Sequence, residues 1–300
     1  MIMDTGLAPI IARIPAFAGA IKISSLGGGL TNRNYRVDTT DNSYVLRIGD
    51  PSSELLGINR DHERINTQKA AQAGVGPSVV DSIPNEHVLV ISWIEARTLH
   101  AADFQSDPAL IKRVATSIKK LHGAQPFECE FDFPKLRKKY LKTAMASGFF
   151  IPDHYLEMEA LIIAMEEKMA KTAEDLVPCN NDLLAENFMD DGNTIWIIDY
   201  EYSGQNEASF EIGNLASEIS LSDNLLAMLC DAYWKRKIPA KYARARAWSM
   251  IARYGWVMWA SIQEAVSPID FDFRTWGMRK WNSVFPELRD AQYQHILENI

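Results

Sequence analysis

The spacing of apolar and polar residues divides the chain into two parts. Between residues 21 and 94, short runs alternate between apolar and polar positions, which is the period of a half-buried strand. These runs predict strands at residues 21–26, 35–38, 44–48, 79–80 and 87–93. From residue 107 onward, most apolar residues recur at the spacing of one helix face. The change near Trp93 predicts one lobe over residues 1–94 and a second lobe over residues 95–300.

Each part also contains segments that depart from its main pattern. Residues 59–73 predict a helix inside the strand-rich part, and the Gly- and Pro-containing segment 74–77 ends it. In the helical part, residues 194–198 predict a strand that follows the turn signal Asp191-Gly192. Residues 178–187 show no helical period. A strand-rich segment followed by a helix-rich one predicts an α+β fold.

Composition excludes several classes of protein. The 300 residues are 47% hydrophobic and 23% charged, which is an ordinary globular profile. The net charge of -8 argues against nucleic-acid binding, so the basic run at 135–142 is expected to be a solvated helix face. No apolar run approaches the ~18 residues of a membrane span, so no membrane insertion is expected.

The amino terminus and the cysteines together predict a cytoplasmic protein. Residues 7–20 are apolar, but Asp4, Arg13 and two prolines make this segment unlike a secretory signal. Cys129, Cys179 and Cys230 are far apart and form no Cys-x-x-Cys pair. They are therefore expected to be small buried thiols in a reducing compartment. The sequence does not indicate an oligomeric state.

A glycine-rich turn lies between the first two predicted strands. Gly27, Gly28 and Gly29 allow unusual backbone angles and close approach to a phosphate, and Thr31 and Asn32 could add side-chain hydrogen bonds. The turn lacks the Gly-Lys-Ser/Thr of a Walker loop and the strand-to-helix context of a dinucleotide fingerprint. A simple hairpin is the alternative interpretation.

An arginine on the next predicted strand has a candidate partner. Arg47 lies between Leu46 and Ile48, and Glu63 lies on the helix predicted to follow. A strand cation held by a helix carboxylate is how kinases direct charge at the phosphates of ATP. The planar guanidinium of an arginine suits phosphate as well as a lysine does. A solvent-exposed strand arginine is the alternative.

The most informative pattern is an ordered set of three polar residues. Asp182 precedes Asn187 by five residues, and Asp199 follows the strand predicted at 194–198. Phosphoryl transfer needs one carboxylate that positions the acceptor hydroxyl and hard oxygen ligands for Mg²⁺. Loop and turn preferences explain each residue separately. They do not explain the ordered set together with the upstream glycines, Arg47 and Glu63.

A tryptophan-rich segment near the carboxyl terminus is a candidate acceptor site. Trp256, Trp259 and Gln263 share a helix face by their spacing, and Trp276 and Trp281 follow shortly after. An ordinary aromatic core is one interpretation. The other is an aromatic site for a quaternary ammonium, because aromatic faces attract cations.

These motifs together resemble the choline/ethanolamine kinase branch of the aminoglycoside-phosphotransferase-like, protein-kinase-like superfamily. The resemblance extends from about residue 21 to residue 281. It includes Gly-Gly-Leu-Thr-Asn32, Tyr-Val-Leu-Arg-Ile48, Arg60-Asp-His-Glu63, Gly76-Pro77, Trp93-Ile-Glu-Ala-Arg-Thr-Leu99, Leu121-His122, Cys-Asn-Asn-Asp-Leu-Leu-Ala-Glu-Asn187, Asp199-Tyr-Glu-Tyr-Ser-Gly204 and Phe210-Glu-Ile-Gly-Asn214. It implies a bilobal fold in which an antiparallel sheet lobe covers ATP and a larger helical lobe carries the catalytic loop.

The resemblance also implies roles for particular residues. Asp182 would be the catalytic base, and Asn187 and Asp199 would bind Mg²⁺. The residues that would contact ATP are Gly28, Gly29, Thr31, Asn32, Arg47, Glu63 and the hinge residues Ser92 and Ile94. Those that would contact the acceptor are Glu201, Glu207, Trp256, Trp259, Gln263 and Trp276. The implied acceptor is choline, ethanolamine or a similar small amino-alcohol.

Two positions depart from the family pattern. Asn180 replaces the usual histidine, and an asparagine can still donate a hydrogen bond to a backbone carbonyl. Glu207 stands where relatives often have an aromatic residue, and in the pocket it would favour a primary amine or a different cation altogether. The remaining alternatives are a kinase for thiamine or an aminoglycoside, and a nucleotide-binding regulatory module without turnover.

Overall fold

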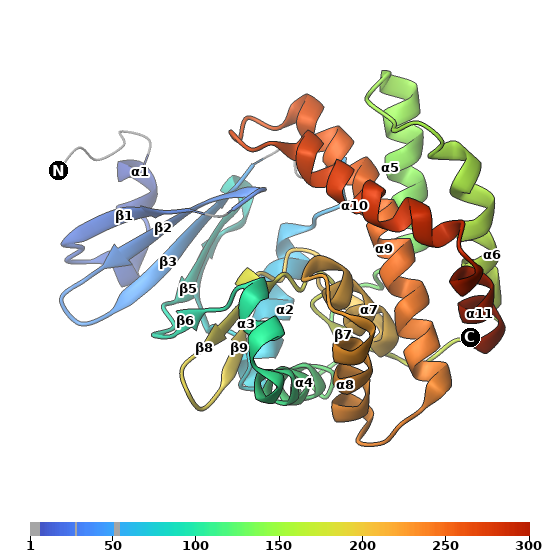
Figure 1. Ribbon diagram of the computed structural model, residues 1–300. Coiled ribbons are helices and arrows are strands. Elements are labelled where there is room, and N and C mark those ends of the chain that lie inside the picture. The colour runs from blue at the N-terminus through green and yellow to red at the C-terminus, as the bar shows by residue number, and fades with distance from the viewer. Residues whose placement is uncertain (1–6, 28, 51–54) are drawn as a thin grey trace.

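A five-stranded antiparallel sheet forms the amino-terminal part of the computed structural model, which describes residues 7–27, 29–50 and 55–300 (Figure 1). Its strands are β1 (Lys22–Leu26), β2 (Asn32–Asp38), β3 (Ser43–Gly49), β4 (Val79–Ile83) and β5 (Val88–Ser92), in the order β1-β2-β3-β5-β4. The short helices α1 (Ala8–Ile11) and η1 (Pro15–Phe17) precede the sheet. Phe17 packs with Val37, Leu46 and Val90 in a small core, which explains the alternation seen in the sequence.

One helix, α2 (Arg60–Gln72), interrupts the strands, as the sequence predicts. Asn59 caps its first turn by accepting hydrogen bonds from the backbone of Asp61 and His62. Its end is followed by Gly74, whose φ of 71° is a left-handed conformation that glycine adopts without steric cost. The helix contacts β4. It thereby places the side chain of Glu63 next to β3.

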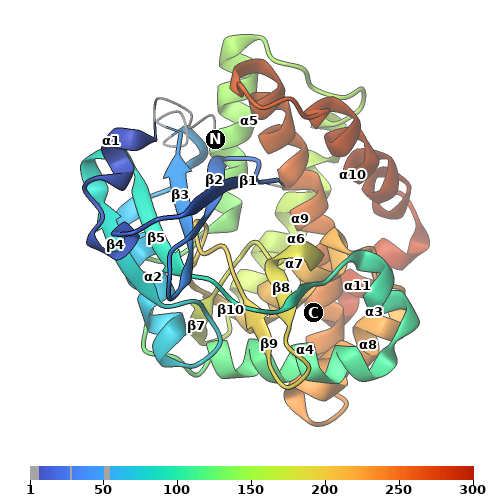
Figure 2. The same cartoon turned by 90° about the vertical axis from the view of Figure 1, so that its left-hand side faces the viewer.

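The second part is mainly helical, and it contains two small sheets. Its helices are α3 (Ala101–Ser106), α4 (Pro108–Leu121), α5 (Phe133–Ser147), α6 (Glu159–Ala170), α7 (Ala208–Glu218), α8 (Asp223–Trp234), α9 (Pro239–Val266), α10 (Phe273–Leu288) and α11 (Ala291–Asn299). The view in Figure 2 shows most of these helices to the right of the amino-terminal sheet, with α4 below it. The α+β prediction, with a sheet lobe followed by a larger helical lobe, is confirmed. The division at residue 94 stays a prediction.

Helix α9 is the centre of the larger core. It contacts α5, α7, α10 and α11, and its residues from 247 to 263 are all buried. Helix α7 approaches it closely at Gly213, where a Cβ atom would lie 2.2 Å from the Ala245 carbonyl oxygen. Only glycine therefore permits this approach of the two helices.

Four short strands were not predicted. They are β6 (Arg97–Thr98), β7 (Leu176–Cys179), β8 (Phe188–Asp190) and β10 (Gly204–Glu207), whereas β9 (Ile195–Ile197) lies within the predicted strand 194–198. They form the sheets β6-β8-β9 and β10-β7. Runs of two to four residues are too short to show a period, so only long-range pairing reveals them.

Three further expectations concern the surface and the thiols. Lys135, Lys138, Lys139 and Lys142 of α5 are exposed, as expected for a solvated face, while Arg137 is buried. Cys179 and Cys230 are buried, but the prediction is wrong for Cys129, which is exposed because it lies in the loop before α5. Across the described part of the chain, no helix has the length and apolar character needed to cross a membrane.

Candidate active site

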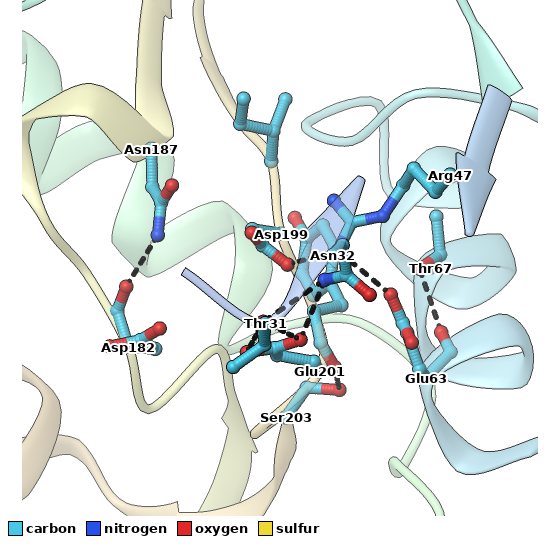
Figure 3. A network of polar contacts seen from close by, with 12 residues as sticks. Thr31, Asn32, Arg47, Glu63, Thr67, Asp182, Asn187, Asp199, Glu201 and Ser203 are labelled. Atoms are coloured by element: carbon cyan, nitrogen blue, oxygen red, sulfur yellow. Dashed lines mark hydrogen bonds and ion pairs between the residues drawn. The ribbon is translucent and has the colours of Figure 1, made fainter. Parts of the chain in front are cut away.

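The segment between β7 and β8 forms a loop that presents Asp182 and Asn187. The backbone turns at Asn181, whose φ is 67°, a left-handed conformation that asparagine tolerates better than most residues. The chain then passes through the short helix η5 (Ala185–Asn187). Asn187 Nδ2 donates a 2.7 Å hydrogen bond to the backbone carbonyl of Asp182, which closes the loop (Figure 3). The segment from Asp182 to Asn187 therefore forms one compact turn.

Asn180 connects this loop to the strand end that carries Asp199. Its Nδ2 donates to the carbonyls of Ile198 at 3.2 Å and Asp199 at 2.7 Å. Its Oδ1 accepts from the backbone N–H of Asp182 at 3.0 Å. The backbone hydrogen bond expected of an asparagine at this position is therefore formed. Asp199 itself has a φ of 63°, so a strained backbone is held at this point.

Glu211 of α7 binds the backbone of the same loop. Its two carboxylate oxygens accept from the backbone N–H groups of Asn180 at 2.9 Å and Asn181 at 2.7 Å. The Glu211 side chain is fully buried. His122, at the end of α4, lies 3.7 Å from it and also contacts the hydroxyl of Tyr233, so His122 is a packing residue.

A network of ion pairs joins the sheet, α2 and the segment that carries Asp199 and Glu201 (Figure 3). Arg47 Nη2 lies 3.0 Å from Glu63 Oε1 and 2.5 Å from Asp199 Oδ1. The Arg47–Glu63 pair predicted from the sequence is therefore present. Arg60 adds contacts to Glu63 at 2.7 Å and to Glu201 at 3.1 Å.

The polar residues of the glycine-rich segment bind a carboxylate. Thr31 Oγ1 donates to Glu201 at 2.7 Å, and Asn32 Nδ2 donates to Glu201 at 2.8 Å. Their predicted contact with ATP stays a prediction, and in this structure their side chains hold the glycine-rich segment against Glu201. Gly28 was also predicted as a phosphate contact, and it lies outside the described residues.

Two cavities meet at Asn187 and Asp199. The first, of about 290 Å³, extends from Gly29 and Arg47 to the strand end that carries Ser92 and Ile94. The second, of about 540 Å³, is lined by residues that include Asp182 and Glu201. Gly29, Glu186, Asn187 and Asp199 line both cavities. The two predicted metal ligands therefore lie at the junction of the two cavities.

Three predicted tryptophans line the second cavity. Trp256 and Trp259 are buried, and their indole N–H groups donate to Asn214 at 2.8 Å and to Tyr202 at 2.9 Å. Both belong to the core and also line the cavity, so the aromatic-core interpretation is confirmed, and the cation site stays a prediction. Trp276 completes this aromatic wall.

Two predicted acceptor residues are elsewhere, and these predictions are corrected. Glu207 accepts hydrogen bonds from Arg244 at 2.6 Å and from Trp248 at 3.0 Å, so its carboxylate is held inside the core. Gln263 donates to the Leu30 carbonyl at 3.1 Å and ties α9 to the glycine-rich segment. Neither residue lines the second cavity.

Sequence reasoning missed a charged pair at this cavity. Lys280 Nζ lies 2.6 Å from both carboxylate oxygens of Glu218, which lines the cavity. The same ammonium lies 4.1 Å from the centre of the Trp276 ring. Glu218 is the last residue of α7 and Lys280 is on α10, and no local pattern indicates that they meet. The contact of Arg60 with Glu63 was also not predicted, although the i,i+3 spacing of the two residues was a usable signal.

Negative charge is concentrated around the junction of the cavities. Burial raises the pKa of Asp182 well above its usual value, and the neighbouring Glu201, Asp199 and Glu218 raise it further. Burial and the proximity of Asp199 likewise raise the pKa of Glu201 to about 7, against the opposing effect of Arg60. Such a group of carboxylates is stabilised by cations.

Comparison with known proteins agrees with this geometry. The family model described as choline/ethanolamine kinase matches residues 23–242. A probable ethanolamine kinase of Arabidopsis thaliana is 25% identical over 87% of this chain and 78% of its own length, and protein LicA of Haemophilus influenzae is 24% identical over 90% and 81%.

Solved structures give the same result. A choline/ethanolamine kinase family protein from Mesorhizobium loti is 28% identical, with a TM-score of 0.86 over 97% of this chain and 96% of that one. Choline kinase LicA from Streptococcus pneumoniae, at 21% identity, shares the fold with a TM-score of 0.80 over 94% of this chain and 98% of that one. With the family model matching well over half of its length, the chain belongs to the choline/ethanolamine kinase family, whose named members are phosphotransferases that act on an alcohol group.

Proposed function

We propose that this protein transfers the γ-phosphate of ATP to the hydroxyl of a small amino-alcohol, choline or ethanolamine. The observation that carries the proposal is the junction of the two cavities at Asn187 and Asp199, with Asp182 on the acceptor side. A nucleotide in the first cavity would place its terminal phosphate near Arg47. An alcohol in the second cavity would lie next to Asp182.

The donor atoms at the junction suit Mg²⁺. Asp199 offers carboxylate oxygens, and Asn187 keeps its side-chain oxygen available because its Nδ2 makes the hydrogen bond to Asp182. Hard oxygen donors of this kind are what Mg²⁺ prefers. When bound, Mg²⁺ would neutralise phosphate charge. In this structure Arg47 holds Asp199, which fixes the direction of the carboxylate.

The protein's own groups account for the remaining chemistry. Asp182 would orient the acceptor hydroxyl and receive its proton during transfer. Arg47, held by Glu63, would direct a fixed positive charge at the phosphates. Trp256, Trp259 and Trp276 would provide the apolar wall against which an ammonium substrate binds.

The competing functions are a kinase for thiamine or an aminoglycoside, and a nucleotide-binding module without turnover. The tryptophan wall favours a small ammonium alcohol over a polar aminoglycoside. The hydrogen bonds of Asn180 favour an active enzyme, because the residue that replaces the usual histidine still braces both Asp182 and Asp199.

A screen for acceptor-dependent ADP release tests the proposal. Choline, ethanolamine, thiamine and aminoglycosides are supplied with ATP and Mg²⁺, and ADP is measured. We expect turnover with choline or ethanolamine that exceeds the acceptor-free rate by at least 10²-fold, since binding in the second cavity orients the hydroxyl. Turnover with thiamine or an aminoglycoside alone would replace the proposed acceptor. The absence of turnover with any acceptor, while ATP raises the melting temperature, would support the regulatory alternative.

The pair Lys280–Glu218 also gives a reason to expect discrimination between the two amino-alcohols. The Lys280 ammonium occupies one face of Trp276 and neutralises Glu218. A quaternary ammonium gains most from open aromatic faces, whereas a primary ammonium also donates hydrogen bonds. Because Lys280 takes one aromatic face, we propose that ethanolamine is the preferred acceptor.

Lys280→Met is expected to shift this preference toward choline. The substitution retains an apolar side chain of similar length but removes the charge. The Lys280 ammonium then no longer competes with a quaternary ammonium for the Trp276 ring, and the unpaired Glu218 attracts either substrate. We expect the ratio of kcat/KM for choline over ethanolamine to rise about 10-fold, mainly through KM. Lys280→Arg is the matched control, because it retains the positive charge and should leave the ratio within about 2-fold. An unchanged ratio in Lys280→Met would show that this lysine has no part in acceptor choice.

A further inference from the structure

The glycine-rich segment passes from the first cavity to the second. Gly27 lines the first cavity, whereas Leu30 and Thr31 line the second. Gly29 lines both, so the segment crosses between the cavities at this residue. A segment predicted from the sequence to approach a phosphate therefore also forms part of the wall of the second cavity.

Two side chains fix this segment to Glu201 (Figure 3). Thr31 Oγ1 lies 2.7 Å from one carboxylate oxygen of Glu201 and 2.8 Å from the other, and Asn32 Nδ2 donates to Oε2 at 2.8 Å. The three residues are buried. Hydrogen bonds to a charged group are stronger than those between neutral groups, so these contacts hold the segment firmly.

A second contact fixes the segment to α9. Gln263 Nε2 donates to the Leu30 carbonyl at 3.1 Å, and Gln263 is only 3% exposed. The Leu30 side chain packs against the large core, to which Trp256 and Trp259 belong. The same helix therefore supplies the tryptophans of the second cavity and the donor that holds the segment beside them.

These contacts narrow the second cavity without filling it. With all of them formed, its volume is about 540 Å³, which lies within the range of sites for small molecules. An amino-alcohol with a few heavy atoms and a terminal phosphate beside it fit in such a volume. The observed position of the segment is therefore compatible with a bound acceptor.

We propose that Thr31 and Gln263 are positioning residues for the acceptor, an inference that rests on the proposed function. By binding Glu201 and the Leu30 carbonyl, they hold Leu30 and Thr31 as a cover that closes the second cavity over the amino-alcohol. The cover restricts the hydroxyl to positions next to Asp182, and such restriction accelerates transfer. This role differs from the ATP contact predicted for Thr31, because Thr31 does not line the first cavity.

Replacement of the Thr31 hydroxyl tests this role. Thr31→Val has nearly the same shape but lacks the donor, so we expect KM for the better of choline and ethanolamine to rise about 10-fold. The Kd for ADP with Mg²⁺ should stay within about 3-fold, because the first cavity keeps its lining. Thr31→Ser retains the hydroxyl and should keep both constants within about 3-fold. Gln263→Met has a similar length without the donor and should raise the same KM.

Three results would overturn the proposal. Weaker binding of ADP with an unchanged acceptor KM would identify Thr31 as a nucleotide contact. A lower acceptor KM in Thr31→Val would show that the segment obstructs the cavity. An acceptor KM that stays unchanged in both Thr31→Val and Gln263→Met would show that the cover has no part in acceptor binding.

Hydrogen exchange examines the same contacts without turnover. Peptides that cover residues 29–34 should exchange about 5-fold faster in Thr31→Val and Gln263→Met than in the unmodified protein, since fewer contacts hold the segment, and Thr31→Ser should match the unmodified protein. Unchanged exchange in both variants would overturn the cover whatever the activity. Faster exchange in a protein that phosphorylates neither amino-alcohol would confirm the contacts and contradict only the proposed function.

Discussion

Asp182→Asn is expected to lower kcat by about 10³-fold while nucleotide binding persists. The substitution retains the size of the side chain but removes its ability to accept the hydroxyl proton, a contribution typically of 10²–10⁴-fold. Asp182 lines the acceptor cavity and not the cavity that would hold the nucleotide, so the affinity for ADP with Mg²⁺ should change by less than about 3-fold. The measurements are steady-state ADP release with the best acceptor and calorimetric titration with ADP.

A matched substitution controls for the change of charge. Asp175→Asn removes a carboxylate from an exposed position just before β7, and kcat should remain within about 2-fold of the unmodified protein. Near-normal turnover in Asp182→Asn would remove this residue from the proposed role. Loss of nucleotide binding together with turnover would instead show that Asp182 shapes the nucleotide cavity, which the arrangement of the two cavities does not predict.

The parts of this site that sequence predicted are those set by short spacings and regular elements. Asp182 and Asn187 lie within one loop, so a five-residue step is enough to bring them together. Asp199 follows a strand whose alternation is visible, and the pairing of Arg47 with Glu63 follows from one strand and the next helix. The sheet lobe was predictable for the same reason, because its strands are long enough to alternate.

The contacts that the sequence did not predict join side chains that lie far apart along the chain. Glu207 has the charge to bind an ammonium, but Arg244 of α9 takes both of its oxygens. Lys280 and Glu218 meet only because α10 packs across α9 and reaches the end of α7. Such contacts depend on helix packing over tens of residues, for which the local pattern carries no signal.

The largest expected loss of stability comes from Glu211→Ala. Glu211 is fully buried and is the acceptor for two backbone N–H groups of the loop that carries Asp182, those of Asn180 and Asn181. Removing the carboxylate leaves both N–H groups buried and unpaired, at about 1–3 kcal/mol each, and creates a cavity. The free energy of unfolding is therefore expected to fall by about 3–5 kcal/mol, measured by urea denaturation.

Two comparison variants show whether the carboxylate itself is responsible. Glu211→Gln keeps one oxygen that accepts from one of the two N–H groups, so it should lose about half as much stability as Glu211→Ala. Glu167→Ala, at an exposed position on α6, should change the free energy of unfolding by no more than about 0.5 kcal/mol. Because Glu211 acts on the loop that carries Asp182, kcat should fall in Glu211→Gln even where the protein is folded. A glutamine variant with unchanged stability and kcat would show that the loop keeps its conformation without this support, and that Asn180 alone suffices to hold Asp182 against Asp199.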